Sequence, residues 1–145
     1  MSYYTAVSGQ ILIEPPLRGA ALKESPFYDP WVGGEAQRCL RLDIDEEPAE
    51  PLGAGEPVAR RVISADVERL HAFDMEDEVQ ELIDAFPGHT FTGRLECMGD
   101  GHWSDMWGVI VRNGRAEKVK PVVVWLAGGR GGVTDLLHTL TTHKT

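Results

Sequence analysis

The sequence has few cysteines, few basic residues and no long apolar run, and each shortage argues against a class of protein. Two cysteines, Cys39 and Cys97, occur among 145 residues, which is far below the density of a disulfide-stapled secreted scaffold. Lys and Arg total 14 against 23 Asp and Glu, and the net charge of -9 disfavours a duplex-DNA binder. No apolar run approaches the roughly 20 residues that a membrane-spanning helix requires, so we expect no membrane contact.

The remaining composition is that of an ordinary globular chain, with 42% hydrophobic and 26% charged residues. At this length we expect one α+β domain at residues 1–126, followed by a Gly-rich joint and an amphipathic tail at 127–145. The first residues lack the basic region and apolar stretch of a secretory signal. We therefore expect a cytoplasmic protein whose two cysteines are buried thiols.

Alternation of apolar and polar residues predicts most of the secondary structure. In the row 38–45, Leu40, Leu42 and Ile44 alternate with charged residues. Asn113-Gly114 is the strongest hairpin signal in the chain, and Pro121 suggests that the strand after this turn lies at an edge or bends. The predicted strands are 3–14, 38–45, 58–65, 89–97, 106–112 and 115–126.

Three segments have helical patterns. The clearest is 75–86, where Asp74 is a good N-cap, apolar residues recur at helical spacing, and Pro87-Gly88 ends the helix. A shorter helical segment is expected at 17–24, after the strand-stopping pair Pro15-Pro16. A third is expected in the tail after Thr134.

The order of these elements is strand, short helix, strand hairpin, long helix and strand, which is the ferredoxin-like pattern. We therefore predict a ferredoxin-like antiparallel sheet with helices on one face, extended by a C-terminal β-meander and a short tail helix.

Catalytic and metal-binding signatures are weak in this sequence. Its histidines are scattered, without a nucleophile elbow or a Cys–His signature. The loop Asp100–Asp105, with Cys97 and His102, lacks the ligand spacing of zinc or calcium sites. The sequence therefore favours a non-enzymatic protein without cofactor or metal, although a hydrolase at this loop stays open as an alternative.

Several aromatic and leucine side chains lie in predicted loops and in the tail, where no core is assured for them. Exposed aromatics are typical interface anchors, and a tail helix of two or three turns is marginal in water unless it docks. Our leading hypothesis is therefore a binding module that acts through a protein partner or through self-association as a homo-oligomer. The candidate partner-binding residues are Trp31, Trp103, Leu136, Leu137 and Leu140.

The alternative is a small-ligand or nucleotide/phosphate-binding protein that uses the Gly-rich loop 128–132. A strand, a glycine loop with one arginine and a capped helix start are what an anion cradle needs, although the Walker lysine is missing. The candidate ligand residues are Gly129, Arg130, Gly131 and Thr134.

Four motifs carry a resemblance: Tyr-Tyr-Thr-x-Val-x-Gly at 3–9, Ile-x-Pro-Pro-Leu at 13–17, Phe-Pro-Gly-His-Thr-Phe-Thr-Gly-Arg at 86–94, and Asp-x-Trp at 105–107 before Val-Arg-x-Gly at 111–114. Through them, from Tyr3 to Trp125, the chain resembles a family of small uncharacterised proteins of actinobacteria and their phages. The resemblance implies a provenance, such as a phage or mobile element, and no particular activity. The tail beyond Leu126 departs from the family pattern.

Overall fold

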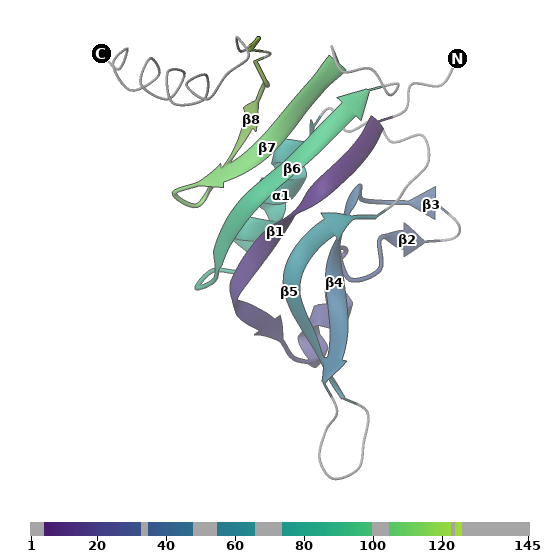
Figure 1. Ribbon diagram of the computed structural model, residues 1–145. Coiled ribbons are helices and arrows are strands. Elements are labelled where there is room, and N and C mark those ends of the chain that lie inside the picture. Colours follow the sequence, from purple (N-terminus) through teal and green to yellow (C-terminus); the bar gives the residue numbers. More distant parts are fainter. Residues whose placement is uncertain are drawn as a thin grey trace.

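The computed structural model describes residues 5–32, 35–47, 55–65, 74–99, 105–122 and 124–125. Within these residues the main element is one six-stranded antiparallel sheet (Figure 1). Its strands are β1 (Thr5–Arg18), β4 (Leu40–Glu47), β5 (Glu56–Ser64), β6 (Thr90–Gly99), β7 (Met106–Arg112) and β8 (Arg115–Val119). They lie in the order β4-β5-β1-β6-β7-β8, and a separate small hairpin joins β2 (Trp31–Val32) to β3 (Glu35–Ala36).

Strand β1 is central and pairs with β6 without interruption, from Thr5 opposite Gly99 to Glu14 opposite Thr90. Its pairing with β5 shifts register between Leu12 and Leu17. Pro15 and Pro16 lie in this irregular stretch, where their missing N–H groups remove no ladder hydrogen bond. The prediction that the proline pair stops the strand is therefore wrong, because β1 continues to Arg18.

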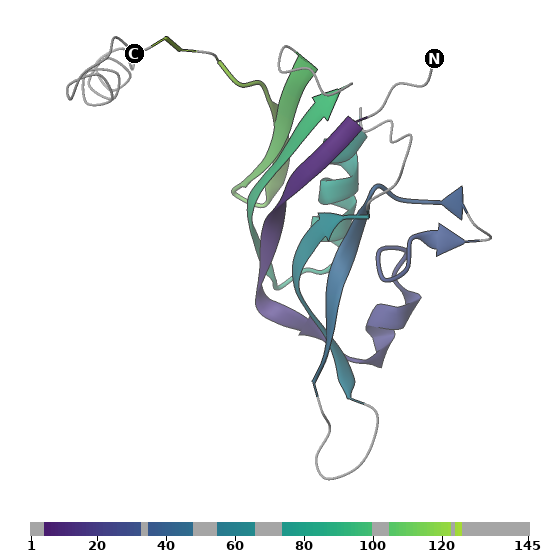
Figure 2. The ribbon, with the colours of Figure 1, turned by 45° about the vertical axis from the view of Figure 1, so that its right-hand side comes forward.

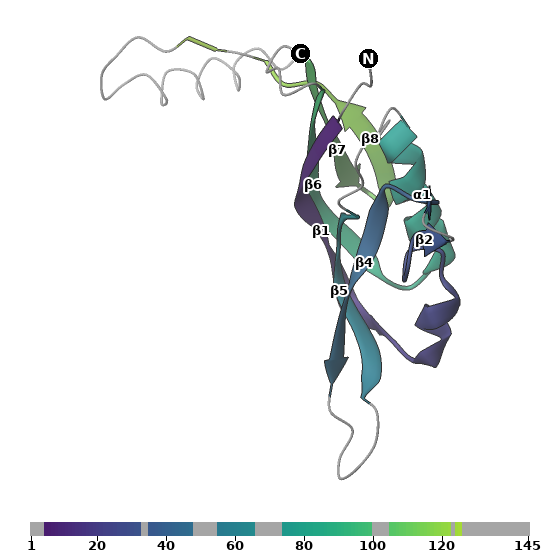
Figure 3. The same ribbon diagram turned by 90° about the vertical axis from the view of Figure 1, so that its right-hand side faces the viewer.

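Alternation along the strands places the core on one face of the sheet only. On β1, Ile11 and Ile13 are buried, whereas Leu12 between them is 41% exposed on the opposite face. Helix α1 (Met75–Ala85) lies across the buried face, and no described element lies against the other face, which we call the open face (Figure 3). The buried core includes Leu40, Leu42, Val62, Met75, Val79, Leu82, Phe91, Leu95, Cys97, Trp107 and Val109.

Helix α1 confirms the strongest helix prediction. Met75, Val79 and Leu82 are its buried residues, and three acidic residues occupy its first turn, where they favour the positive end of the helix dipole. Asp74 precedes the helix without forming the side-chain capping bond that we expected. The helix ends before Gly88, which adopts a φ of 87°.

The ferredoxin-like prediction is wrong, because α1 is the only α-helix among the described residues and the sheet has six strands. Leu17 and Arg18 pair with Ala59 and Val58, so the start of the predicted first helix belongs to the sheet. What remains is a five-residue 3-10 helix, η1 (Ala20–Glu24). The predicted tail helix and the joint at 127–145 lie outside the described residues.

Both predicted hairpins are present. Strands β4 and β5 pair antiparallel, and β7 and β8 pair through the turn at Asn113 and Gly114, whose φ values of 52° and 75° are those of a tight hairpin turn. Strand β8 is an edge strand, and it ends at Val119, before Pro121. Both cysteines are free thiols.

Candidate functional site

The open face of the sheet carries charged side chains that pair with one another. Arg61 Nε lies 2.6 Å from Asp43 Oδ2, and Arg94 Nη2 lies 2.8 Å from Glu96 Oε1. Further pairs join Arg60 to Asp45 and Arg112 to Glu117. Because such exposed pairs contribute little to stability, they mainly keep this face hydrated and close to neutral.

The same face offers no aromatic stacking platform within the described residues. Phe91 on β6 and Trp107 on β7 are each 5% exposed and belong to the core on the other side. Binding of single-stranded nucleic acid usually relies on aromatic side chains that stack with bases. The described part of this face therefore does not have the chemistry of such a site.

A hollow of about 280 Å³ interrupts the charged surface over β6, β7 and β8. Gly108 lines this hollow, lies between Glu96 on β6 and Val119 on β8, and has no side chain to fill the space. A Cβ atom at Gly108 would lie 2.9 Å from the Leu95 carbonyl oxygen, so the close backbone approach itself requires glycine. The apolar residues that line the hollow with Gly108 are Met106, Trp107, Ile110, Val119 and Pro121.

The border of the hollow is polar. Arg94, Glu96 and Lys120 line it together with the apolar residues. An apolar centre inside a charged border is the usual anatomy of a protein-binding surface.

The chain leaves β8 at the border of this hollow as an arm, which we define as the described residues 120–122 and 124–125. Lys120 and Pro121 line the hollow, and the next apolar side chains are exposed: Val122 by 83%, Val124 by 48% and Trp125 by 92%. The yellow-green end of the trace runs away from the sheet (Figure 2). An indole in this position keeps a large apolar area in water.

Helix α1 closes part of the free edge of β8 next to the hollow. The backbone N–H of Ala116 donates to Gln80 Oε1 at 2.9 Å, and Gln80 Nε2 donates to the Gly114 carbonyl at 3.4 Å. These backbone groups would otherwise be open to another strand. Strand addition at this end of β8 is therefore blocked.

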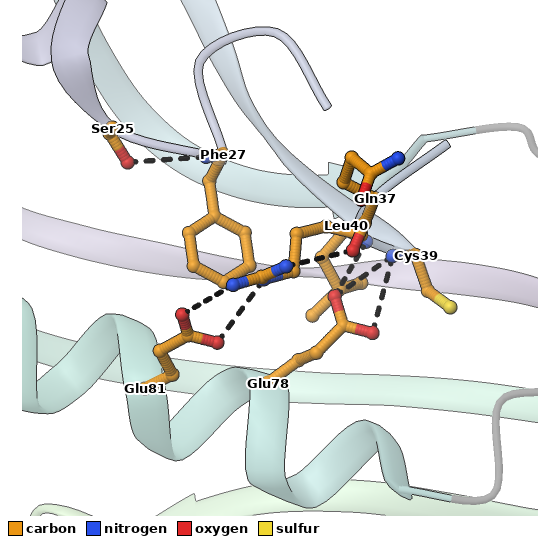
Figure 4. A network of polar contacts seen from close by, with 8 residues as sticks. Ser25, Phe27, Gln37, Cys39, Leu40, Glu78 and Glu81 are labelled. Carbon is orange, nitrogen blue, oxygen red and sulfur yellow. Dashed lines mark hydrogen bonds and ion pairs between the residues drawn. The ribbon is translucent and has the colours of Figure 1, made fainter. Parts of the chain in front are cut away.

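On the opposite side of the molecule, two glutamates of α1 bind the start of β4 (Figure 4). Glu78 accepts hydrogen bonds from the backbone N–H of Cys39 at 2.9 Å and of Leu40 at 3.3 Å. Arg38 donates to both carboxylate oxygens of Glu81, at 2.9 and 3.2 Å, and its guanidinium lies 5.5 Å from the centre of the Phe27 ring.

The thiol in this cluster is not activated. Burial, followed by the negative charge of Glu78, raises the pKa of Cys39 to about 12. Burial also raises the pKa of Cys97 to about 11. Because the thiolate is the nucleophile, both cysteines have the properties of packing residues. We therefore interpret the cluster as a clamp between α1 and β4.

Metal and membrane sites were also sought among the described residues. There, His, Cys, Asp and Glu side chains nowhere gather as a group of three or more suited to a metal ion. None of the described helices combines the length and the apolar character needed to cross a bilayer. Residues 100–104 of the acidic loop lie outside the described part of the chain.

The predicted site residues fall in different places. Trp31, in β2, is 44% exposed. All the other candidates lie outside the described residues: Trp103, Gly129, Arg130, Gly131, Thr134, Leu136, Leu137 and Leu140. Sequence reasoning missed Val122 and Trp125 because it placed them in a strand running to 126. Pro121 was the available signal, since proline cannot donate to a ladder.

Together, these features describe a class of protein: an antiparallel sheet with one buried face and one open face, the open face carrying an apolar hollow and an exposed arm. The chain belongs to a family of unknown function, DUF6205, whose model matches residues 1–137. This match extends beyond Leu126, where we had expected the resemblance to end. No curated protein and no solved structure gives a significant match.

Proposed function

We propose that this protein is a non-enzymatic binding module whose docking surface consists of the hollow around Gly108 and the arm, residues 120–122 and 124–125. The observation that carries the proposal is the 92% exposure of Trp125 at the end of a segment that borders an apolar hollow. Tryptophan is among the residues most enriched at the energetic centre of protein interfaces. The partner that docks on this surface is a protein, either a different chain or a second copy of this one.

The chemistry of the rest of the described surface supports this reading. The half-buried carboxylate of Glu78 is engaged by two backbone N–H groups, and the pKa of the neighbouring Cys39 thiol is raised. A general acid, a general base or a nucleophile needs a free and suitably tuned group. These two groups are therefore assigned to stability rather than to catalysis.

A photo-crosslinking experiment tests the proposal. A photoreactive amino acid replaces Val122, which is 83% exposed on the arm, and in a control it replaces Leu12, which is 41% exposed on the open face. We expect irradiation in the cell to give a discrete protein adduct from position 122, and the adduct should disappear when Trp125→Ala is added.

Equal labelling at both positions, or no adduct at position 122, would contradict the proposal. The phage or mobile-element origin implied by the resemblance stays a prediction. So does the anion site at Gly129, Arg130, Gly131 and Thr134, for which the described residues add no supporting observation.

A further inference from the structure

We infer that the partner of the docking surface is a second copy of this chain, and that two copies exchange arms so that Trp125 of each enters the Gly108 hollow of the other. The inference rests on the proposed function and names its partner. It starts from the fact that one chain carries both halves of the contact, an exposed apolar arm and an apolar hollow. In a two-fold dimer, the arm of each copy can meet the hollow of the other copy.

The arm is built to reach outward rather than to fold back onto its own hollow. Residues 122–124 are three consecutive valines, whose β-branched side chains favour extended backbone. Pro121 fixes the backbone at the point of departure, and no glycine lies between it and Trp125 to allow a tight return. A stretch of five residues such as 121–125 would span at most about 16 Å if it were fully extended.

The hollow has the size and lining that an indole requires. Its volume is about 280 Å³, and its walls include Met106, Ile110 and Val119. A cavity of about 150 Å³ already accommodates benzene, so a space of this size accepts the larger indole ring. The carboxylate of Glu96 at the border provides an acceptor for the indole N–H, the one polar group that such a burial would have to satisfy.

The area available is that of a stable dimer. The exposed parts of Val122, Val124 and Trp125 together present on the order of 400 Å² of apolar surface, with an equal area covered on the partner. If all of this area were covered, two reciprocal arms would bury at most about 1,600 Å² in total, which reaches the standard size of a specific interface. A single arm in a single hollow would bury only half of that area.

The geometry also disfavours two simpler dimers. Direct pairing of two β8 edges is hindered because Gln80 occupies the backbone N–H of Ala116, and Lys118 and Lys120 are like charges along the same short edge. Packing of two open faces would bury the charged pairs Arg94–Glu96 and Arg61–Asp43. Arm exchange leaves Arg61–Asp43 in water and uses Glu96, at the border of the hollow, as the acceptor of the indole N–H.

The test is analytical ultracentrifugation of the full chain over a range of concentrations. We expect the wild type to reach a plateau at two protomers. Trp125→Ala changes both contacts of the two-fold dimer, so it should raise the dimer Kd by on the order of 100–10,000-fold, twice the free energy of one buried tryptophan hot spot. Ile110→Glu in the hollow should do the same, and Val119→Lys repeats the hollow test if Ile110→Glu unfolds. Leu12→Ser is the matched control and should leave the Kd unchanged.

Mixing the two variants distinguishes arm exchange from other modes of dimerisation. Trp125→Ala keeps an intact hollow, and Ile110→Glu keeps an intact arm, so their mixture can form one productive arm–hollow contact. We expect a heterodimer in the mixture at concentrations at which each variant alone is a monomer.

Several results would overturn the inference. One is a wild type that stays monomeric at all concentrations. Another is a dimer whose Kd is unchanged by both substitutions, or a mass that keeps rising with concentration without a plateau at two protomers. If the wild type is a monomer while position 122 still crosslinks to a different protein, the inference fails and the proposed function stands. If position 122 gives no adduct and the wild type is a monomer, both fail.

Discussion

The side chain of Gln80 on α1 accepts a hydrogen bond from the backbone N–H of Ala116 on β8, at 2.9 Å, and thereby joins the helix to the edge of the sheet. The same amide group donates to the carbonyl of Gly114 and to Asp84 Oδ1. One helix side chain therefore closes the turn end of an edge strand. This places the free part of the β8 edge at Lys118 and beyond, where the arm begins.

Replacement of Gln80 should weaken this end of the sheet. We expect Gln80→Ala to lower the free energy of unfolding by about 1 kcal/mol, because the Ala116 N–H loses its protein acceptor. Gln80→Glu is the matched control, since it keeps an acceptor oxygen and should retain most of the stability. Urea denaturation measures both, and equal midpoints for the wild type and Gln80→Ala would contradict the assigned role.

The two glutamates of the helix clamp should differ in importance. Glu78→Ala leaves two backbone N–H groups without their acceptor and should cost about 1–3 kcal/mol. Glu81→Ala removes an exposed ion pair with Arg38 and should cost about 0–1 kcal/mol. Thermal and urea unfolding of the two variants compare them directly, and a larger loss for Glu81→Ala would refute the clamp as described.

The pH dependence of stability should carry the signature of Glu78. Burial raises the pKa of its carboxyl in the folded state, while hydrogen bonds from Cys39 and Leu40 partly oppose the shift. The folded-state pKa lies above the unfolded-state pKa. At pH values between the two, the folded state therefore holds the proton more often than the unfolded state does, and protonation stabilises the fold. This contribution to stability is therefore present below the unfolded pKa and is lost as the pH rises through the folded pKa.

Glu78→Gln removes this titration. The difference in free energy of unfolding, wild type minus Glu78→Gln, should therefore decrease as the pH is raised from about 4 to about 7. Urea titrations of both proteins at steps across that range measure it. A difference that rises with pH would show that the hydrogen bonds to the carboxylate outweigh its burial.

Two glycines with positive φ should respond differently to the same substitution. Gly93 on β6 has a φ of 138°, and a Cβ there would clash with the Gln10 carbonyl oxygen of β1. Gly88 has a φ of 87°, and a Cβ there would meet nothing within 4 Å. We expect Gly88→Ala to cost about 1–2 kcal/mol from backbone strain alone, and Gly93→Ala to cost more than about 3 kcal/mol. Similar losses in calorimetry would mean that β1 and β6 separate easily at this point.

Local patterns in the sequence were enough to locate most of the strands and the long helix. The alternation around Leu40 and Leu42, the helical spacing of Val79 and Leu82, and the Asn113-Gly114 turn each act over a few residues, so they can be recognised without knowledge of the fold. Trp107 alternates in step with Val109 along β7, a local pattern that favours the core, and it is buried.

The number of helices and the end of β1 depended on contacts between distant segments. The pairing of Leu17 with Ala59 draws the start of the predicted first helix into the sheet, and no local propensity of residues 17–24 reveals that partner. The candidate site also arises from contacts between segments that are distant in the sequence. The hollow exists because β6, β7 and β8 bring Glu96, Gly108 and Val119 side by side.

The sequence by itself therefore determined which residues alternate, where the long helix lies and which turn closes the last hairpin, because those preferences are local. Only the tertiary structure decided which face of the sheet stays open, where a glycine leaves a hollow in it and that Trp125 stands in water beside it. These features follow from the pairing of strands that are far apart in the chain. The sequence around a glycine or a tryptophan does not reveal which residues such pairing places next to it.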